Sequence, residues 1–168
     1  QTVLQVEQLG TAHAVAQAGD ALTGFDGDAI VLYGDTPFIS AETLEAMAKA
    51  RTSHDIVVLG FEAADAGRYG RLVTQGDVLE RIVEFKDATD EERSIKLCNS
   101  GVISAKSSML FDLIEAVKND NASGEYYLTD IIGIARAMDD PTFITVNAKS
   151  DIKTLEDLIA RSKEKPLN

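Results

Sequence analysis

Short apolar runs alternate with segments of helical pattern along most of the chain. Residues 29–33, 55–61 and 97–104 are largely apolar over five to eight positions, the length of a strand that is buried on both faces. Residues 142–146 form a further run of this kind. Because such strands alternate with helices, the pattern predicts an α/β fold with a mostly parallel sheet covered by helices on both faces.

The segments between these runs predict helices, several with recognisable N-terminal signals. Ser40 is a good N-cap for residues 41–51, and Thr89 and Glu92 have the spacing of a capping box. Ser107 is expected to cap another helix. Further helices are expected at 8–22, 128–138 and 150–163. Residues 70–84 instead indicate a hairpin, with its turn at 76–77, and so a mixed region at one side of the sheet.

Length and charge narrow the class of protein. With 168 residues, 45% of them hydrophobic, the chain suits a single domain spanning 1–168. The net charge of −12 argues against a nucleic-acid or anionic-membrane partner, because either requires a basic face. Cys98 is the single cysteine, so no internal disulfide can form and a reducing compartment is favoured. With neither a signal peptide nor an apolar run of membrane-spanning length, we expect a cytoplasmic protein.

The segment 33–37 follows the first predicted strand and carries the first candidate for chemistry. Ligands of open α/β sheets gather at the carboxyl ends of strands. Asp35 at such an end can offer oxygen ligands to Mg²⁺, which prefers carboxylates together with substrate phosphates. The alternative is that Gly-Asp-Thr-Pro is only a turn between strand and helix.

Two more groups of residues are candidates for ligand contacts. Gly10 and Thr11 could grip a base or phosphate, and the amide of Gln5 could pair with a nucleobase edge. The alternative is that Gly10 and Thr11 belong to an ordinary strand-to-helix connection. His13, which follows them, is interpreted as a helix-surface or packing residue. The polar loops around Gly70, Glu84 and Asn99 could bind sugar hydroxyls. In the stretch 124–130, one of the two tyrosines is expected to pack in the core.

Taken in order, these segments resemble a known family. The chain is similar to the bacterial N-acetylglucosamine-1-phosphate uridylyltransferases, which make UDP-N-acetylglucosamine for cell-wall peptidoglycan. The resemblance covers roughly the first four-fifths of the chain, and the ordered set of motifs is highly specific. The matching stretches are QVEQLGTAH at 5–13, LYGDTP at 32–37, YGR at 69–71, IVEFKDATDE at 82–91, CNSG at 98–101 and NASGEYYLTD at 121–130.

The resemblance implies a Rossmann-like nucleotide-diphospho-sugar transferase sandwich and a set of site residues. Asp35 would be the catalytic magnesium ligand, and Tyr33 would lie near nucleotide and sugar. Contacts to uracil are implied for Gln5, Gly10 and Thr11, contacts to sugar or ribose hydroxyls for Gly70, Glu84 and Asn99, and the N-acetylglucosamine pocket for Tyr127 and Thr129.

The implied reaction is attack by N-acetylglucosamine-1-phosphate on the α-phosphorus of UTP, with release of pyrophosphate. Such chemistry depends on positioning and charge neutralisation, so the absence of a marked nucleophile fits it. The family's glycine-rich phosphate loop is not found before Gln1, its second metal ligand is not clearly reproduced at Asn147, and its hexapeptide-repeat acetyltransferase domain is absent. We therefore expect an N-terminally truncated domain, inactive alone, whose full-length form could oligomerise. Alternatives are the same chemistry on another sugar-1-phosphate or nucleotide, and a non-catalytic relative that binds a sugar nucleotide.

Overall fold

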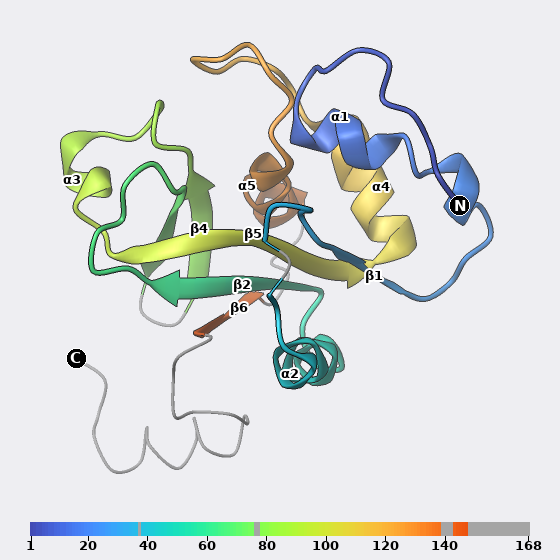
Figure 1. Ribbon diagram of the computed structural model, residues 1–168, viewed down its shortest axis with the longest axis horizontal. Helices are drawn as coiled ribbons and strands as arrows, with labels where there is room; N and C mark the ends of the chain where they lie inside the picture. Colours follow the sequence, from blue (N-terminus) through green and yellow to red (C-terminus); the bar gives the residue numbers. More distant parts are fainter. Residues whose placement is uncertain (37, 76–77, 139–142, 148–168) are drawn as a thin grey trace.

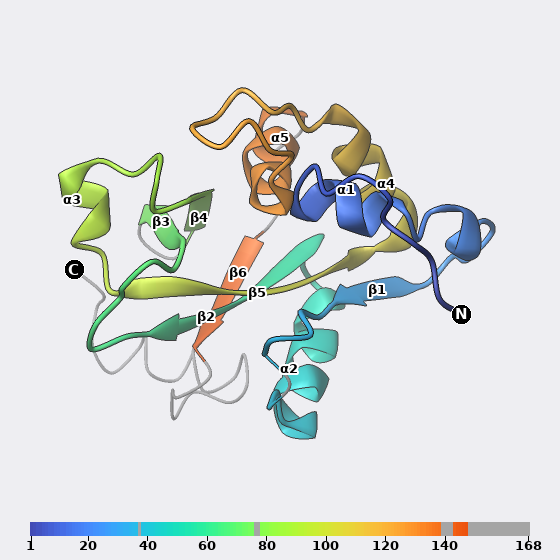
Figure 2. The same cartoon turned by 45° about the horizontal axis from the view of Figure 1, so that its top comes forward.

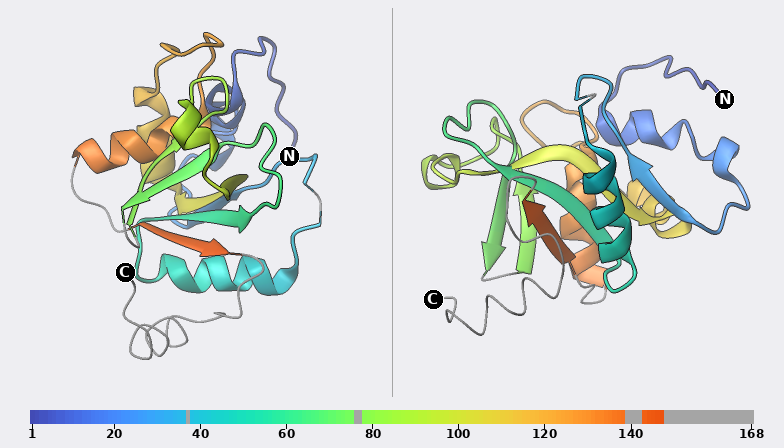
Figure 3. Two further views of the ribbon diagram at one scale, coloured as in Figure 1. Left: turned by 90° about the vertical axis from the view of Figure 1, so that its left-hand side faces the viewer. Right: turned by 60° about the horizontal axis from the view of Figure 1, so that its bottom comes forward.

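The computed structural model describes residues 1–36, 38–75, 78–138 and 143–147, and within them a central sheet lies between two layers of helices (Figures 1 and 2). Helices α1 (Thr11–Ala16), α4 (Ser107–Ala116) and α5 (Ile131–Met138) lie on one face. Helix α2 (Ala41–Arg51) lies on the other, as Figure 3 also shows. The predicted α/β sandwich is therefore confirmed.

The sheet is mainly antiparallel, so the expectation of a mostly parallel sheet was wrong for the described strands. Its order is β4-β3-β5-β2-β6, with β1 also paired to β5. Only the β2–β6 pairing is parallel among the described pairs. The strands are β1 (Asp28–Val31), β2 (Ile56–Glu62), β3 (Arg71–Gln75), β4 (Val78–Val83), β5 (Leu97–Lys106) and β6 (Phe143–Asn147).

The reason for this error lies in the position of β5. Strands β1 and β2 are joined through α2 and run in the same direction, as the alternation of strand and helix predicts. They are not neighbours, however, because Ala105 of β5 pairs with Ala29 on one side and with Ile56 on the other. Strand β5 thus runs antiparallel between two mutually parallel strands. The β3–β4 hairpin adds another antiparallel pair.

Local signals located most helix starts correctly. The Ser40 hydroxyl accepts a hydrogen bond from the Thr43 amide at 3.2 Å, and Thr89 and Glu92 form the predicted capping box at the start of α3 (Asp90–Arg93). Ser107 is not a cap: it is the first residue of α4, its side chain is buried, and Lys106 occupies the N-cap position.

Two predicted helices are shorter than their patterns suggested. The expected helix at 8–22 begins only after Gly10 and breaks into α1 and a 3₁₀ turn, η1 (Asp20–Leu22). The helix expected from 128 starts as a 3₁₀ turn, η2 (Leu128–Asp130), and continues as α5. The hairpin turn at 76–77 and the helix at 150–163 lie outside the described residues.

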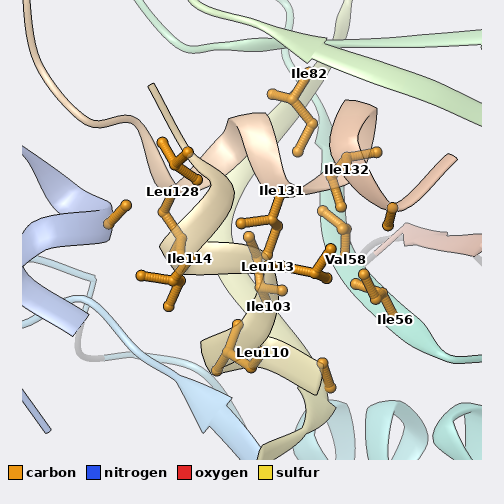
Figure 4. Packing of buried hydrophobic residues seen from close by; sticks show 14 of the residues in the cluster. Ile56, Val58, Ile82, Ile103, Leu110, Leu113, Ile114, Leu128, Ile131 and Ile132 are labelled. Atoms are coloured by element: carbon orange, nitrogen blue, oxygen red, sulfur yellow. The ribbon is translucent and has the colours of Figure 1, made fainter. Parts of the chain in front are cut away.

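Apolar side chains pack on both faces of the sheet, which explains the unbroken apolar runs. Ile56 and Val58 of β2 point toward α4 and α5, where they join the larger core cluster (Figure 4). Val57 and Leu59 point the other way and pack with Met47 of α2. Alternate residues of one strand therefore fill two separate core layers. Among the described residues, no helix combines the length and apolarity needed to cross a bilayer.

Candidate functional site

Four of the predicted site residues meet at one end of the sheet, although they come from four separate segments. The Gly70 carbonyl accepts a hydrogen bond from the backbone N–H of Asn99 at 2.9 Å. The Thr129 hydroxyl donates to Glu84 Oε1 at 3.0 Å. A Cβ atom at Gly70 would lie 3.4 Å from Glu84 Oε2, so the glycine leaves room for this carboxylate. We call Gly70, Glu84, Asn99 and Thr129 the sugar side of the site, after the sugar contacts that the sequence resemblance implies for them.

The Glu84 carboxyl has an unusual electrostatic environment. Burial raises its pKa, and the nearby charge of Asp87 raises it further, while the Thr129 hydrogen bond acts in the opposite direction. Burial also raises the pKa of Asp130, helped by the charges of Glu84 and Asp87. A partly buried carboxylate of this kind is a strong acceptor for hydroxyl groups of a bound ligand.

Tyr33 connects the sugar side to the N-terminal segments. Its ring lies against Gly101, whose φ is +85°, and a Cβ atom there would be 2.5 Å from Tyr33 Cε2. The Thr11 side chain lies close to the phenol, and its Oγ1 accepts a hydrogen bond from the Leu128 backbone amide at 2.9 Å. Burial raises the pKa of Tyr33, with smaller contributions from the charges of Glu84 and Asp35. Tyr33 therefore packs against Gly101 and lines a pocket together with Thr11.

Gly10 is required by a close backbone contact. The Ala12 amide donates to the Tyr126 carbonyl at 2.9 Å, and the Tyr126 amide donates to the Leu9 carbonyl at 2.8 Å. Gly10 has a φ of +121°, and a Cβ atom there would lie 2.5 Å from the Tyr126 carbonyl oxygen. This contact holds the start of α1 against the segment that precedes η2.

The amide of Gln5 has a fixed orientation that sequence reasoning missed. Its Nε2 lies 3.2 Å from the Gly10 carbonyl oxygen and 3.0 Å from Nδ1 of His13. A carbonyl can only accept, so the group facing it must be the NH₂, and Nδ1 of His13 then accepts as well. Gln5 Oε1 is left as the open acceptor. His13, interpreted from the sequence as a surface or packing residue, orients Gln5, and no local pattern joins two residues eight positions apart.

Asp35 lies on the turn after β1, at the wall of a pocket of about 400 Å³ that Thr11, Tyr33 and Gly34 also line. The turn is closed by the Thr36 amide, which donates to the Tyr33 carbonyl at 3.1 Å. The Asp35 side chain is exposed, and no group of three His, Cys, Asp or Glu side chains is assembled in the part of the chain that the structure describes. One exposed carboxylate fits an ion such as Mg²⁺, which keeps several waters and takes substrate phosphate oxygens as ligands.

One of the two tyrosines of the 124–130 stretch packs in the core, as predicted, and the role of the other stays a prediction. Tyr126 packs against the larger core cluster. Tyr127 stands at the N-cap of η2, close to Ser123, and burial raises the pKa of its phenol. The charges of Asp87, Glu125 and Glu84 raise that pKa further.

The buried side chain of Arg71 supports the loop before Gly70, a role that the sequence did not reveal. It is 2% exposed, and its guanidinium donates to the carbonyls of Gly67 at 3.0 Å and Ala66 at 3.3 Å, as well as to Tyr69 and Arg93. It also lies over the Phe85 ring, 5.9 Å from the centroid. Arg71 therefore ties the loop before Gly70 to the residue that follows Glu84.

Comparison with known proteins places this site in a family. The family described as nucleotidyl transferase matches residues 1–166. The bifunctional protein GlmU of Ruegeria pomeroyi is 60% identical over 159 residues, which cover 89% of this chain and 35% of the relative. GlmU of Rhodospirillum rubrum is 52% identical and covers 99% of this chain and 40% of the relative. The chain thus spans well under half the length of these relatives.

Solved structures show the same fold. UDP-glucose pyrophosphorylase from Acinetobacter baumanii aligns with a TM-score of 0.65 at 21% identity, over 98% of this chain and 60% of that one. A UDP-glucose pyrophosphorylase complexed with UDP-glucose aligns with a TM-score of 0.64 at 17% identity, over 96% of this chain and 65% of that one. The match along nearly all of the sequence, at high identity to the GlmU relatives, shows that this chain belongs to the nucleotidyl transferase family.

Proposed function

We propose that this chain carries the base-binding and sugar-binding parts of a site for uridylyl transfer from UTP to N-acetylglucosamine-1-phosphate, giving UDP-N-acetylglucosamine and pyrophosphate. The observation that carries the proposal is the convergence of Glu84, Asn99 and Thr129 near Tyr33, together with the oriented amide of Gln5 on the Gly10 carbonyl. The identity to the GlmU relatives and the motifs quoted above support the choice of nucleotide and sugar.

On the base side, the free Oε1 of Gln5 is suited to a base that presents a ring N–H. Uracil has such a group at N3, and cytosine has a lone pair at the same position. Gly10 packs closely against the Tyr126 backbone, and its carbonyl anchors the Gln5 amide. The arrangement therefore favours uridine over cytidine nucleotides.

On the sugar side, Glu84 accepts hydrogen bonds from ring hydroxyls, and Thr129 holds its carboxylate in place. The Asn99 side chain is 8% exposed, and its Oδ1 already accepts from the Gly101 amide at 3.1 Å, so its NH₂ is left to donate to the ligand. Tyr127 would line the pocket for the acetamido group. These groups recognise a sugar by a matched set of donors and acceptors.

Asp35 would hold Mg²⁺ in the proposed enzyme. The bound ion would neutralise negative charge on the phosphates and on the released pyrophosphate. The side chains of this chain bind and orient base and sugar, so that the sugar phosphate faces the α-phosphorus. We place the reaction in the cytoplasm, where both substrates are made available to cell-wall synthesis.

Titration calorimetry with UDP-N-acetylglucosamine, UDP-glucose and UDP tests this proposal on the chain itself. We expect UDP-N-acetylglucosamine to bind roughly tenfold or more tightly than UDP-glucose, because a pocket built for a polar substituent loses its hydrogen bonds with the analogue. A preference for UDP-glucose would contradict the sugar assignment. Binding with no pyrophosphate release by the full-length protein, given UTP, sugar phosphate and Mg²⁺, would identify a non-catalytic relative.

A further inference from the structure

Two loops that are distant in the sequence are fastened together beside the sugar side. The Asp87 carboxylate accepts a hydrogen bond from the Ala122 amide at 2.8 Å. Lys86 Nζ donates to Ser123 Oγ at 2.8 Å, and the Ser123 side chain lies close to the Tyr127 phenol. We call these contacts of Lys86 and Asp87 with residues 122–127 the clasp. Figure 2 shows the loop after α4 reaching toward α3, the helix that follows Lys86 and Asp87.

The segment held by the clasp is itself internally ordered. Asn121 Oδ1 accepts from the amides of Ser123 and Glu125, each at 3.2 Å, and its Nδ2 donates to the Glu125 carbonyl. Residues 121–125 therefore behave as one folded turn. Fixing such a turn at Ala122 and Ser123 also restrains Tyr127, which lies two residues beyond the end of the turn.

Electrostatics alone would not place Asp87 here. Its charge is close enough to raise the pKa of both Glu84 and Asp130, so three carboxylates share this region at a cost in free energy. The hydrogen bond to Ala122 offsets that repulsion, and Lys86 contributes a positive charge beside it. Both residues are exposed, so their contacts link two loops and leave the core untouched.

We propose that Lys86 and Asp87 are positioning residues, which hold residues 121–127 against the loop that carries Glu84 and so fix Tyr127 at the sugar pocket. The inference rests on the proposed function for its consequence, which is tighter binding of the N-acetylhexosamine part of the ligand. The clasp itself is defined without a ligand. The clasp contacts and their effect on ligand binding can therefore be tested separately.

Hydrogen–deuterium exchange on the unliganded chain tests the clasp. In the double variant Lys86→Met/Asp87→Ala, we expect amide exchange at 121–127 to rise roughly 3- to 10-fold, the change that a lost hydrogen bond gives. Lys86→Arg/Asp87→Asn keeps a donor and an acceptor and should restore slow exchange. The matched control is Lys118→Met/Asp120→Ala, because both residues are exposed and neither shows a side-chain bond among the described residues. Unchanged exchange at 121–127 in the first variant would overturn the inference.

Ligand binding tests the consequence. The Met/Ala variant should bind UDP-N-acetylglucosamine roughly 3- to 10-fold more weakly and bind UDP with unchanged affinity, because only the sugar side loses its support. An equal loss for UDP, or an equal loss in the control variant, would contradict a role in sugar positioning. If the unchanged chain binds neither ligand while exchange responds as expected, the proposed function fails and the clasp stands.

Discussion

The sugar side and the base side of the site are built in different ways. On the sugar side, Asn99 and Thr129 are 8% and 4% exposed, and each site residue is held by a contact with another segment. On the base side, Thr11 and Asp35 are exposed, and Gln5 is half-buried on a segment whose neighbours Leu4 and Val6 are 78% and 81% exposed. One side is assembled by the fold, and the other presents its groups to solvent.

This difference predicts which side of the site contributes more to ligand affinity and which contributes more to turnover. Groups that are already fixed lose little entropy when a ligand arrives, so the sugar side should contribute affinity and selectivity. Asp35 is exposed at the pocket wall, and in the proposed function it would act together with the phosphates of a bound ligand. The base and metal side should therefore affect turnover more than it affects ground-state binding of the product.

The largest expected effect comes from Asp35→Asn. In the full-length protein this change should lower Mg²⁺-dependent pyrophosphate release by about 100-fold or more, because an amide no longer offers the anionic oxygen that the ion requires. The exposed side chain makes no contact that the fold needs, so thermal unfolding should be unchanged. A coupled assay for pyrophosphate and a melting curve measure both quantities.

Retained activity in Asp35→Asn would remove the metal assignment. Loss of UDP-N-acetylglucosamine binding in the same variant would contradict the division between the two sides, since Asp35 would then support the sugar pocket. Asp65→Asn serves as a control, because it replaces an exposed aspartate on a loop before β3.

Glu84→Gln should give the next largest effect, now on binding. We expect roughly 10- to 100-fold weaker binding of UDP-N-acetylglucosamine, because hydrogen bonds to a charged acceptor are stronger than those to an amide. Binding of UDP should change little. Calorimetry on the two ligands measures the difference, and an equal loss for both would show that the carboxylate does not face the sugar.

The same variant should change how stability depends on pH. The pKa of Glu84 is raised in the folded state. At a pH between its unfolded and folded pKa, the native state therefore keeps a proton that the unfolded chain has lost. The free energy of unfolding therefore falls as pH rises from the ordinary carboxyl range through the raised folded pKa. Glu84→Gln should flatten that fall, as urea unfolding between pH 4 and pH 8 would show. A steeper fall in the variant would contradict the burial argument.

Sequence reasoning located the strands and the residues of the site more readily than their arrangement. Residues 55–61 are apolar on both faces because β2 lies between two core layers, and a local pattern reports that directly. The insertion of β5 between β1 and β2 depends on pairings across the whole chain, so strand direction was wrong. Asn99 stood out because an amide inside an apolar strand needs a partner.

The supporting contacts were out of reach for the same physical reason. Arg71 is held mainly by backbone carbonyls, which any residue type supplies, so no partner can be identified from the sequence. The bond between Glu84 and Thr129 joins positions 45 residues apart. Motifs name the groups that are proposed to touch a ligand, whereas the groups that hold them in place emerge only from packing.

The smallest expected effect, on the base side, comes from His13. His13→Phe removes the acceptor for Gln5 Nε2 and keeps a ring of similar size, while the bond from Gln5 to the Gly10 carbonyl remains. Since one of two anchors is lost, we expect the preference for UDP over CDP to fall roughly 2- to 5-fold, as the amide gains freedom to turn its NH₂ toward the base. His13→Asn places an amide oxygen near the position of Nδ1 and should restore the preference. Competition titrations with the two nucleotides measure the ratio. An unchanged ratio in His13→Phe would show that Gly10 alone orients Gln5, and that the base side needs no support from α1.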